Sequence, residues 1–181
     1  MSLKIEIKPN EIWDANAREF HKIEGGVLVL EHSLVSISKW ESKWHKPFFT
    51  DKIEKTHEEM IDYIRCMTIN QNANPYVFYA LNEQNVNDIR DYINDPMTAT
   101  TINDRTKTSK KTQIVTSELI YYWMICYNIP IEFQKWHINR LITLIQLCKV
   151  ENANASGTNK MTRNEALERT RQINQMRRNK K

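Results

Sequence analysis

Glycine scarcity is the feature that most restricts what this chain can fold into. The sequence contains 3 glycines among 181 residues. Glycine adopts positive φ at little cost, so tight hairpin turns and phosphate-binding loops depend on it. The shortage excludes a glycine-rich loop of the kind that cradles a nucleotide phosphate, and it disfavours a fold made of many tight hairpins. We therefore expect a mainly helical chain that is not a nucleotide-dependent enzyme.

Length and composition are those of one folded domain. A chain of 181 residues lies within the range of about 100–200 residues for a single domain, long enough to bury a sizeable core. Hydrophobic residues make up 40% and charged residues 27%, which excludes wholesale disorder. The sequence has no run of about 18 apolar residues, so it predicts no transmembrane helix and no membrane partner.

Only the first 31 residues carry a strand pattern. Over residues 3–8 aliphatic and charged side chains alternate with period two, which is typical of a half-buried strand. Two further short runs, 18–23 and 27–30, follow a turn at 14–16. The sequence predicts a small antiparallel β-meander within residues 1–31.

Residues 32–150 carry helical signals and are expected to form the helical core of a globular domain spanning 1–150. Ser33, Thr56 and Thr116 stand where a side chain can cap a helix, and Glu59 completes a capping box with Thr56. The predicted helices and turns cover about 33–44, 56–67, 75–81, 86–95, 116–127 and 130–150. The last two are expected to pair as an αα-hairpin at the centre of the core.

The C-terminal end is set apart by its charge. Residues 151–159 are small and polar and are interpreted as a linker. Residues 160–181 contain eight Lys or Arg and two Glu, a net charge of +6 in a chain whose total is +4. A thin apolar stripe that includes Leu167 and Ile173 runs through this segment, so we expect a basic C-terminal helix or tail that docks weakly or awaits a partner.

A search for catalytic and ligand-binding motifs finds none. The segment His57-Glu58-Glu59-Met60-Ile61 begins like a zinc-protease helix, but Ile61 stands where the second histidine belongs. The five histidines show no metal-ligand spacing, and Cys-x-x-Cys and Gly-x-Ser-x-Gly motifs are absent from the sequence. We predict a non-enzymatic protein without catalytic, cofactor-binding or metal-binding residues.

The cysteines indicate a reducing compartment. Cys66, Cys126 and Cys148 are too few and too scattered for a disulfide framework, and each lies in an apolar context. We expect buried thiols and a cytoplasmic protein.

Tryptophans and the basic tail are the candidate partner-binding residues. Trp40 and Trp44 are one helical turn apart and surrounded by charged residues, so they fit either interface anchors or core residues. Trp123 and Trp136 are expected in the core. The proposed contact surface consists of Trp40, Trp44, Leu167, Ile173, Arg177 and Arg178.

Several stretches together resemble a family of small proteins of tailed bacteriophages. The stretches are LEHSLVSISKWESKWHKPF (30–48), YIRCMTIN (63–70), YINDPMTATT (92–101), TSELIYYWMICYNIP (116–130), QKWHINRLITLIQL (134–147) and NKMTRNEALERTRQINQMRR (159–178). The resemblance covers about residues 28–178 in the same order. Members of this family are described as tail assembly chaperones.

The resemblance implies a non-enzymatic role in the host cytoplasm during virion morphogenesis. Tail assembly chaperones keep the long, helical tape-measure protein soluble while tail-tube subunits polymerise around it. The implied partner is thus the tape-measure protein or another tail protein, and self-association into a homo-oligomer stays open. The family has no catalytic motif to carry over, and the basic C-terminal helix departs from the acidic character of many such chaperones.

Two alternatives remain beside the chaperone. That basic departure leaves room for a structural virion protein of the tail, neck or baseplate. A nucleic-acid-binding accessory protein that uses residues 160–181 ranks below both, because no aromatic residue follows Trp136 to stack on bases. Nucleic acid is therefore not the expected partner.

Overall fold

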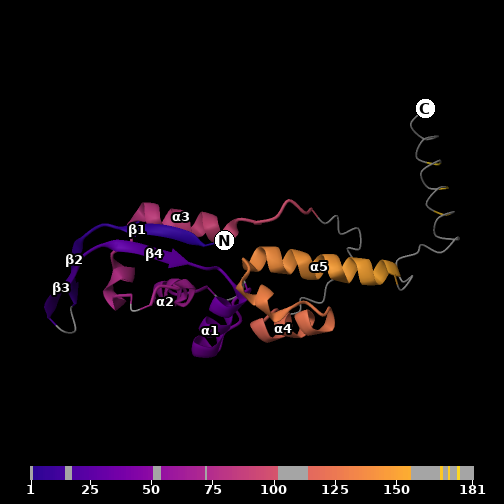
Figure 1. Ribbon diagram of the computed structural model, residues 1–181, viewed down its shortest axis with the longest axis horizontal. Coiled ribbons are helices and arrows are strands. Elements are labelled where there is room, and N and C mark those ends of the chain that lie inside the picture. Colours follow the sequence, from indigo (N-terminus) through magenta and orange to yellow (C-terminus); the bar gives the residue numbers. More distant parts are fainter. Residues whose placement is uncertain are drawn as a thin grey trace. The chain divides into compact units, whose positions relative to one another are not determined.

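Figure 1 shows a computed structural model of the chain. It describes residues 2–14, 18–50, 54–71, 73–101 and 114–155, together with Glu168, Arg171 and Gln175. The chain divides into two compact units, Met1–Ile145 and Gln146–Lys181. The prediction of a mainly helical chain with a small N-terminal antiparallel β region is confirmed.

Four short strands form two antiparallel pairs, one nested inside the other. The strands are β1 (Leu3–Ile7), β2 (Asn10–Asp14), β3 (Glu19–Ile23) and β4 (Gly26–Leu30). β1 pairs with β4 and β2 pairs with β3. The predicted meander is therefore wrong, because in a meander the first strand would pair with the next one along the chain. The alternation within β1 identified a strand but carried no information about its partner.

The nesting follows from burial on one face and from a bend at a glycine. Ile5 of β1 pairs with Leu28 of β4, and both side chains are buried. Between β3 and β4, Gly25 has a φ of +83°, and a Cβ there would lie 2.8 Å from the carbonyl oxygen of Ile7. Only glycine allows this close approach without a shift, so the second pair bends away from the first at this point.

The chain after the second helix extends the β1–β4 pair along β4. The amide of Glu31 donates to the carbonyl of Met67, and the amide of Ile69 donates to the carbonyl of Val29. The side chain of Asn70 also bonds to the β4 backbone. These bonds fix the end of the second helix against the sheet.

The described part of the chain contains five α-helices, three of which begin at predicted caps. They are α1 (Leu34–Trp44), α2 (His57–Met67), α3 (Glu83–Asn94), α4 (Ser117–Cys126) and α5 (Ile138–Ala155), with 3-10 turns η1 (Pro75–Tyr79) and η2 (Ile131–Lys135). Ser33, Thr56 and Thr116 each accept a hydrogen bond from a backbone amide in the first turn of their helix, as predicted. In α2, Glu59 completes the predicted capping box.

The helix predicted from Pro130 onward begins later and ends later. Residues 131–135 form η2, Trp136 is extended, and α5 starts at Ile138. The amide of Ile138 donates to the carbonyl of His32, and Ser33 pairs with His137 as an isolated β-bridge. This contact with a segment a hundred residues earlier holds the backbone extended just before α5. The helix then continues through residues 151–155, where the sequence predicts a linker.

The core lies between the β1–β4 pair and the helices that cover it, not in an αα-hairpin alone. α1 packs against α2 and α4, while α3 packs against β1 (Figure 1). The buried side chains form one cluster that reaches from the sheet through α1 and α2 to α4 and the start of α5. Trp123 and Trp136, expected in the core, are only half-buried. Of the three cysteines expected to be buried, Cys126 is exposed and the other two are half-buried.

Candidate functional site

The two tryptophans proposed as partner anchors lie in the contact between α1 and α2. Trp40 is 1% exposed, and its indole N–H donates to the carbonyl of Glu59 at 2.9 Å. Trp44 is half-buried, and its indole N–H donates to the Asp62 carboxylate at 2.9 Å. Trp40 is therefore a core residue that cannot contact a partner from the folded chain, so its assignment as an anchor is wrong.

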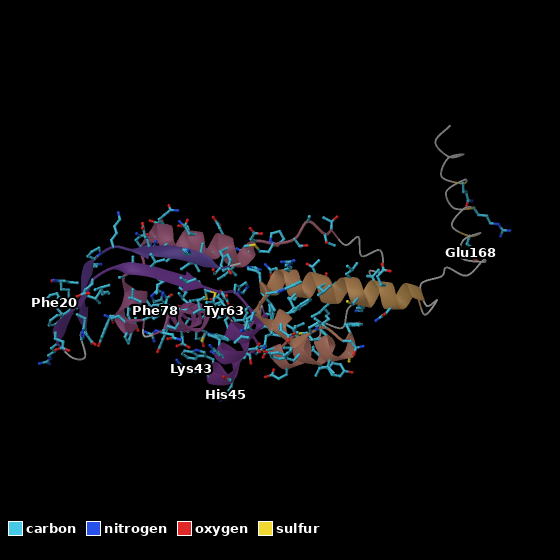
Figure 2. The ribbon with its side chains drawn as sticks, in the orientation of Figure 1. Phe20, Lys43, His45, Tyr63, Phe78 and Glu168 are labelled. Carbon is cyan, nitrogen blue, oxygen red and sulfur yellow. The ribbon has the colours of Figure 1, made fainter. Side chains whose placement is uncertain are left out.

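Two lysines of the α1 region form ion pairs with α2 at the edge of this contact. The Lys43 ammonium lies 2.5 Å from the Asp62 carboxylate and 5.4 Å from the centre of the Trp44 ring. Lys46 forms an ion pair with Glu59, and this hydrogen bond is the main cause that lowers the pKa of Glu59. Figure 2 labels Lys43 on α1 and Tyr63 on α2. The charged residues around the tryptophans thus hold α1 to α2. The other proposed contact residues, Leu167, Ile173, Arg177 and Arg178, lie outside the described residues.

An apolar groove between α2, η1 and α3 is the surface best suited to bind a partner. Its volume is about 390 Å³. The deepest residues are buried side chains from all three elements: Ile61, Ile64, Phe78 and Ile89. Figure 2 labels Phe78 on η1. The groove therefore belongs to the packed core at its base and opens to solvent above it.

Large apolar side chains also line the open rim of this groove, which we call the α2–α3 groove. Met60 of α2 is 41% exposed, Tyr79 of η1 is 52% exposed and Val86 of α3 is 39% exposed. Scattered single apolar residues are ordinary on a protein surface, but a continuous apolar lining with an exposed rim marks an interaction site. Because α3 contributes residues 86–94, the groove is about two helical turns long.

The charged side chains that line the groove are cationic. Arg90 carries this charge, His57 also lines the groove, and none of the described residues in the lining is acidic. Behind the groove, the Arg65 guanidinium lies 5.3 Å from the centre of the Phe78 ring and 5.4 Å from that of Tyr79. Arg65 also donates to the carbonyl of Pro75, which begins η1. Arg65 therefore fixes the aromatic wall of the groove and adds to its positive charge.

Sequence reasoning did not identify this groove, although both of its helices carried a signal. Met60, Ile61 and Ile64 make an apolar stripe on α2, as Val86, Ile89 and Ile93 do on α3. Each stripe includes an apolar residue that stays exposed, Met60 on α2 and Val86 on α3. An apolar stripe wider than the buried face was the signal available in the sequence. The sequence pattern does not show that the exposed apolar residues of α2 and α3 line the same groove together with η1.

A second cluster, of histidine and tyrosine, is buried between four segments. The His32 imidazole shares a hydrogen bond with the hydroxyl of Tyr63. The backbone amide of His32 donates to the hydroxyl oxygen of Tyr92 at 3.3 Å. His137 bonds to the carbonyl of Tyr92 at 2.9 Å, and the His32 and His137 rings lie 4.9 Å apart. Burial lowers the pKa of His32 to about 3 and also lowers the pKa of His137.

This cluster joins the residues after β4 and before α5 to helices α2 and α3. Both histidines are neutral at pH 7 and are almost fully buried. Neither imidazole lines the α2–α3 groove. Within the described ranges, no group of three or more His, Cys, Asp or Glu side chains could hold a metal ion.

Another hollow, of about 480 Å³, lies where the sheet bends at Gly25 and Gly26. Its walls include Lys22, Glu24, Asn70 and Asn74 beside a few aliphatic side chains. Charged groups of both signs and open backbone make it a solvated recess, whereas most of the side chains that line the α2–α3 groove are apolar. We therefore take the α2–α3 groove as the candidate functional site although it is the smaller of the two.

Comparison with known proteins adds no further guide to function. No protein-family model, curated protein or solved structure matches the chain. Among the helices in the described part of the chain, none has both the length and the apolar character to cross a membrane.

Proposed function

We propose that the protein is a non-enzymatic tail assembly chaperone that binds helical segments of a phage tape-measure protein in the α2–α3 groove. The observation that carries the proposal is this groove, with an exposed apolar rim and a cationic lining. The resemblance to small tailed-phage proteins supplies the biological setting. The host cytoplasm is the corresponding place of action.

The shape and chemistry of the groove favour an amphipathic helix as the bound segment. A helix that docks in a groove presents apolar anchors at i, i+3, i+4 and i+7, which span about two turns. The α2–α3 groove has the same length, and Met60 offers a flexible side chain that adapts to different anchors. One groove of this kind fits many similar helical segments along one long client.

The charges of the groove select the polar flank of that helix. Arg90 lines the groove, and Arg65 lies behind its aromatic wall. A client helix with Asp or Glu beside its apolar stripe places carboxylates near these cations, whereas a basic flank is repelled. We therefore expect the bound segments to be amphipathic helices with acidic flanks.

Co-expression with the tape-measure protein of the same phage tests the proposal. The wild-type chain is expected to keep the tape-measure protein soluble and to co-purify with it after a high-salt wash, because most of the contact is apolar. A Val86→Glu variant places a carboxylate on the rim, and we expect it to reduce the co-purified client at least fivefold. Met60→Glu should act in the same way from the opposite wall.

Gln84→Glu is the matched control, since Gln84 is exposed on α3, does not line the groove and bonds to Asp88 and not to Arg90. This variant should retain the client at the wild-type level. Equal losses for Val86→Glu and Gln84→Glu, or no loss for either, would contradict the assignment of the groove. Circular dichroism of each variant confirms that the helices remain folded.

The copy number in purified virions distinguishes the chaperone from a structural virion protein. A chaperone acts during assembly and is expected to be absent or far below one copy per ring of tail subunits. A constant stoichiometric amount in washed particles would favour the structural alternative. Loss of all binding on deletion of 160–181, together with steep salt dependence, would instead favour nucleic acid.

A further inference from the structure

The exposed side of α4 is an apolar face that no described element covers. Ile120 and Met124 point into the core, where α4 packs on α1. On the opposite side, Tyr122 is 60% exposed and Ile125 is 75% exposed. A helix that is hydrophobic all round is normally buried on all sides. Among the described elements, none therefore covers the exposed half of α4, which its apolar composition would favour burying.

This face continues beyond the helix and is free of charge. Residues 119–131 contain no Asp, Glu, Lys, Arg or His. Ile131, just after the helix, is 54% exposed. The nearest ionisable side chains along the chain are Glu118 at one end and Glu132 at the other. We call Tyr122, Ile125 and Ile131, with the exposed Cys126 beside them, the α4 face.

The lack of charge points to the occupant. Two copies of one surface can meet only when like charges are not brought together, because an isologous contact places the same patch opposite itself. The α2–α3 groove fails this condition, since its cations would face one another. The α4 face meets it, and obligate homodimer interfaces are more apolar than contacts between transient partners. We propose that the α4 face is a homodimer interface occupied by the α4 face of a second copy of this chain.

An antiparallel pairing of the two α4 helices satisfies both the apolar and the charged residues. With the two-fold axis between Tyr122 and Ile125, each tyrosine ring packs against the isoleucine of the other copy. At a rise of about 1.5 Å per residue, the two Glu118 carboxylates then lie roughly 16 Å apart along the helix direction. That separation is about twice the screening length at physiological salt, so their repulsion is weak.

Sedimentation velocity over a range of protein concentrations tests the interface. The wild-type chain should sediment at twice its mass of 21.6 kDa at tens of micromolar. Ile125→Glu should sediment as a monomer and raise the dissociation constant at least a hundredfold, because it buries two carboxylates against each other. Ile125 is largely exposed, so the variant is expected to keep its helical circular dichroism.

Val86→Glu is the matched control, because it makes the same kind of change on the exposed rim of the α2–α3 groove. It should leave the dimer intact, while Ile125→Glu should leave tape-measure binding intact. Dimerisation and tape-measure binding are thus tested by different variants, so either can fail without the other. A Val86→Glu protein that becomes monomeric, or an Ile125→Glu protein that stays dimeric, would place the interface elsewhere.

Alkylation of Cys126 provides a second readout that needs no mutation. The rate of its reaction with iodoacetamide should fall as protein concentration rises through the dimer range, and it should be independent of concentration in Ile125→Glu. A wild-type chain that remains monomeric with a constant Cys126 rate at about 100 μM would overturn the proposal. So would loss of tape-measure binding in a monomeric Ile125→Glu protein, because the α4 face would then be a client surface.

Discussion

At the scale of single residues, burial and hydrogen bonding separate tryptophans of the core from tryptophans of the surface. Trp40 illustrates the point, because its indole N–H donates to the carbonyl of Glu59 and ties α1 to α2. Trp13 has the opposite environment, since it is 51% exposed on β2 and contacts the ring of Phe20 across the hairpin. The two residues are of the same type and differ in burial, because Trp40 is 1% exposed and Trp13 is 51% exposed.

We predict that Trp40→Phe lowers the free energy of unfolding by about 2–4 kcal/mol. The change leaves the Glu59 carbonyl without its donor and removes ring volume from the core. Trp13→Phe should change it by less than about 1 kcal/mol, because the side chain is half exposed. Urea unfolding of both variants measures the difference, and equal effects would contradict the placement of Trp40.

The buried histidines make stability dependent on pH. His32 has an ordinary pKa of 6.5 when exposed, and burial lowers it to about 3 in the folded protein. Below pH 6.5 the unfolded chain binds a proton that the folded chain excludes, so stability is full above this pH and falls as the pH decreases towards 3. His137, whose pKa is also lowered, adds to the same loss.

The free energy of unfolding should fall by about 2 kcal/mol for His32 between about pH 7 and pH 5. His32→Gln is expected to flatten this dependence, whatever its effect on stability at pH 7. His45→Gln, at an exposed position after α1, should keep the wild-type slope. Urea unfolding across this pH range measures the slopes, and a wild-type slope in His32→Gln would show that His32 is accessible to protons when folded.

At the scale of elements, the ends of the helices are set by local chemistry. α4 begins at the Thr116 cap and ends in a Schellman motif, in which the amide of Ile129 donates to the carbonyl of Met124 and that of Asn128 donates to Ile125. Asn128 has a φ of 53°, in the left-handed region that asparagine tolerates better than most residues. Both ends of the helix beside the α4 face are therefore fixed by single residues.

Asn128→Ala should lower the free energy of unfolding by about 1 kcal/mol, because alanine is strained at positive φ. Asn128→Gly should leave it unchanged or raise it slightly, since glycine adopts this conformation without strain. Thermal and urea unfolding of the two variants provide the measurement. A less stable glycine variant than alanine variant would be inconsistent with the left-handed cap.

Element boundaries were largely predictable, whereas pairings were not. The caps at Ser33, Thr56 and Thr116 depend on a side chain and an amide within one turn, so the local sequence is sufficient. The pairing of β1 with β4 and the extended backbone at Trp136 depend on contacts between distant segments. No pattern within a short window contains that information.

The same limit applies to the candidate site. The stripes on α2 and α3 were visible in the sequence, but the groove exists only because η1 joins their exposed edges. The conspicuous tryptophans drew attention to α1 because Trp is common both in interfaces and in cores. Burial decides between these uses, and burial is a property of the folded chain.

At the scale of the whole molecule, two exposed apolar surfaces differ in charge. The α2–α3 groove is lined by cations and is proposed to bind client helices, while the α4 face is neutral and is proposed to bind a second copy. If both proposals hold, a dimer presents two grooves to one long client.

Site-specific photocrosslinking tests the central claim most directly. A benzophenone amino acid at position 86, on the rim of the groove, or at position 87, just outside it, is introduced into the chain co-expressed with the tape-measure protein. We predict crosslinks from position 86 to amphipathic helical segments of the tape-measure protein, and at least tenfold fewer from position 87. Absence of crosslinks at position 86, or equal yields at both positions, would contradict the account.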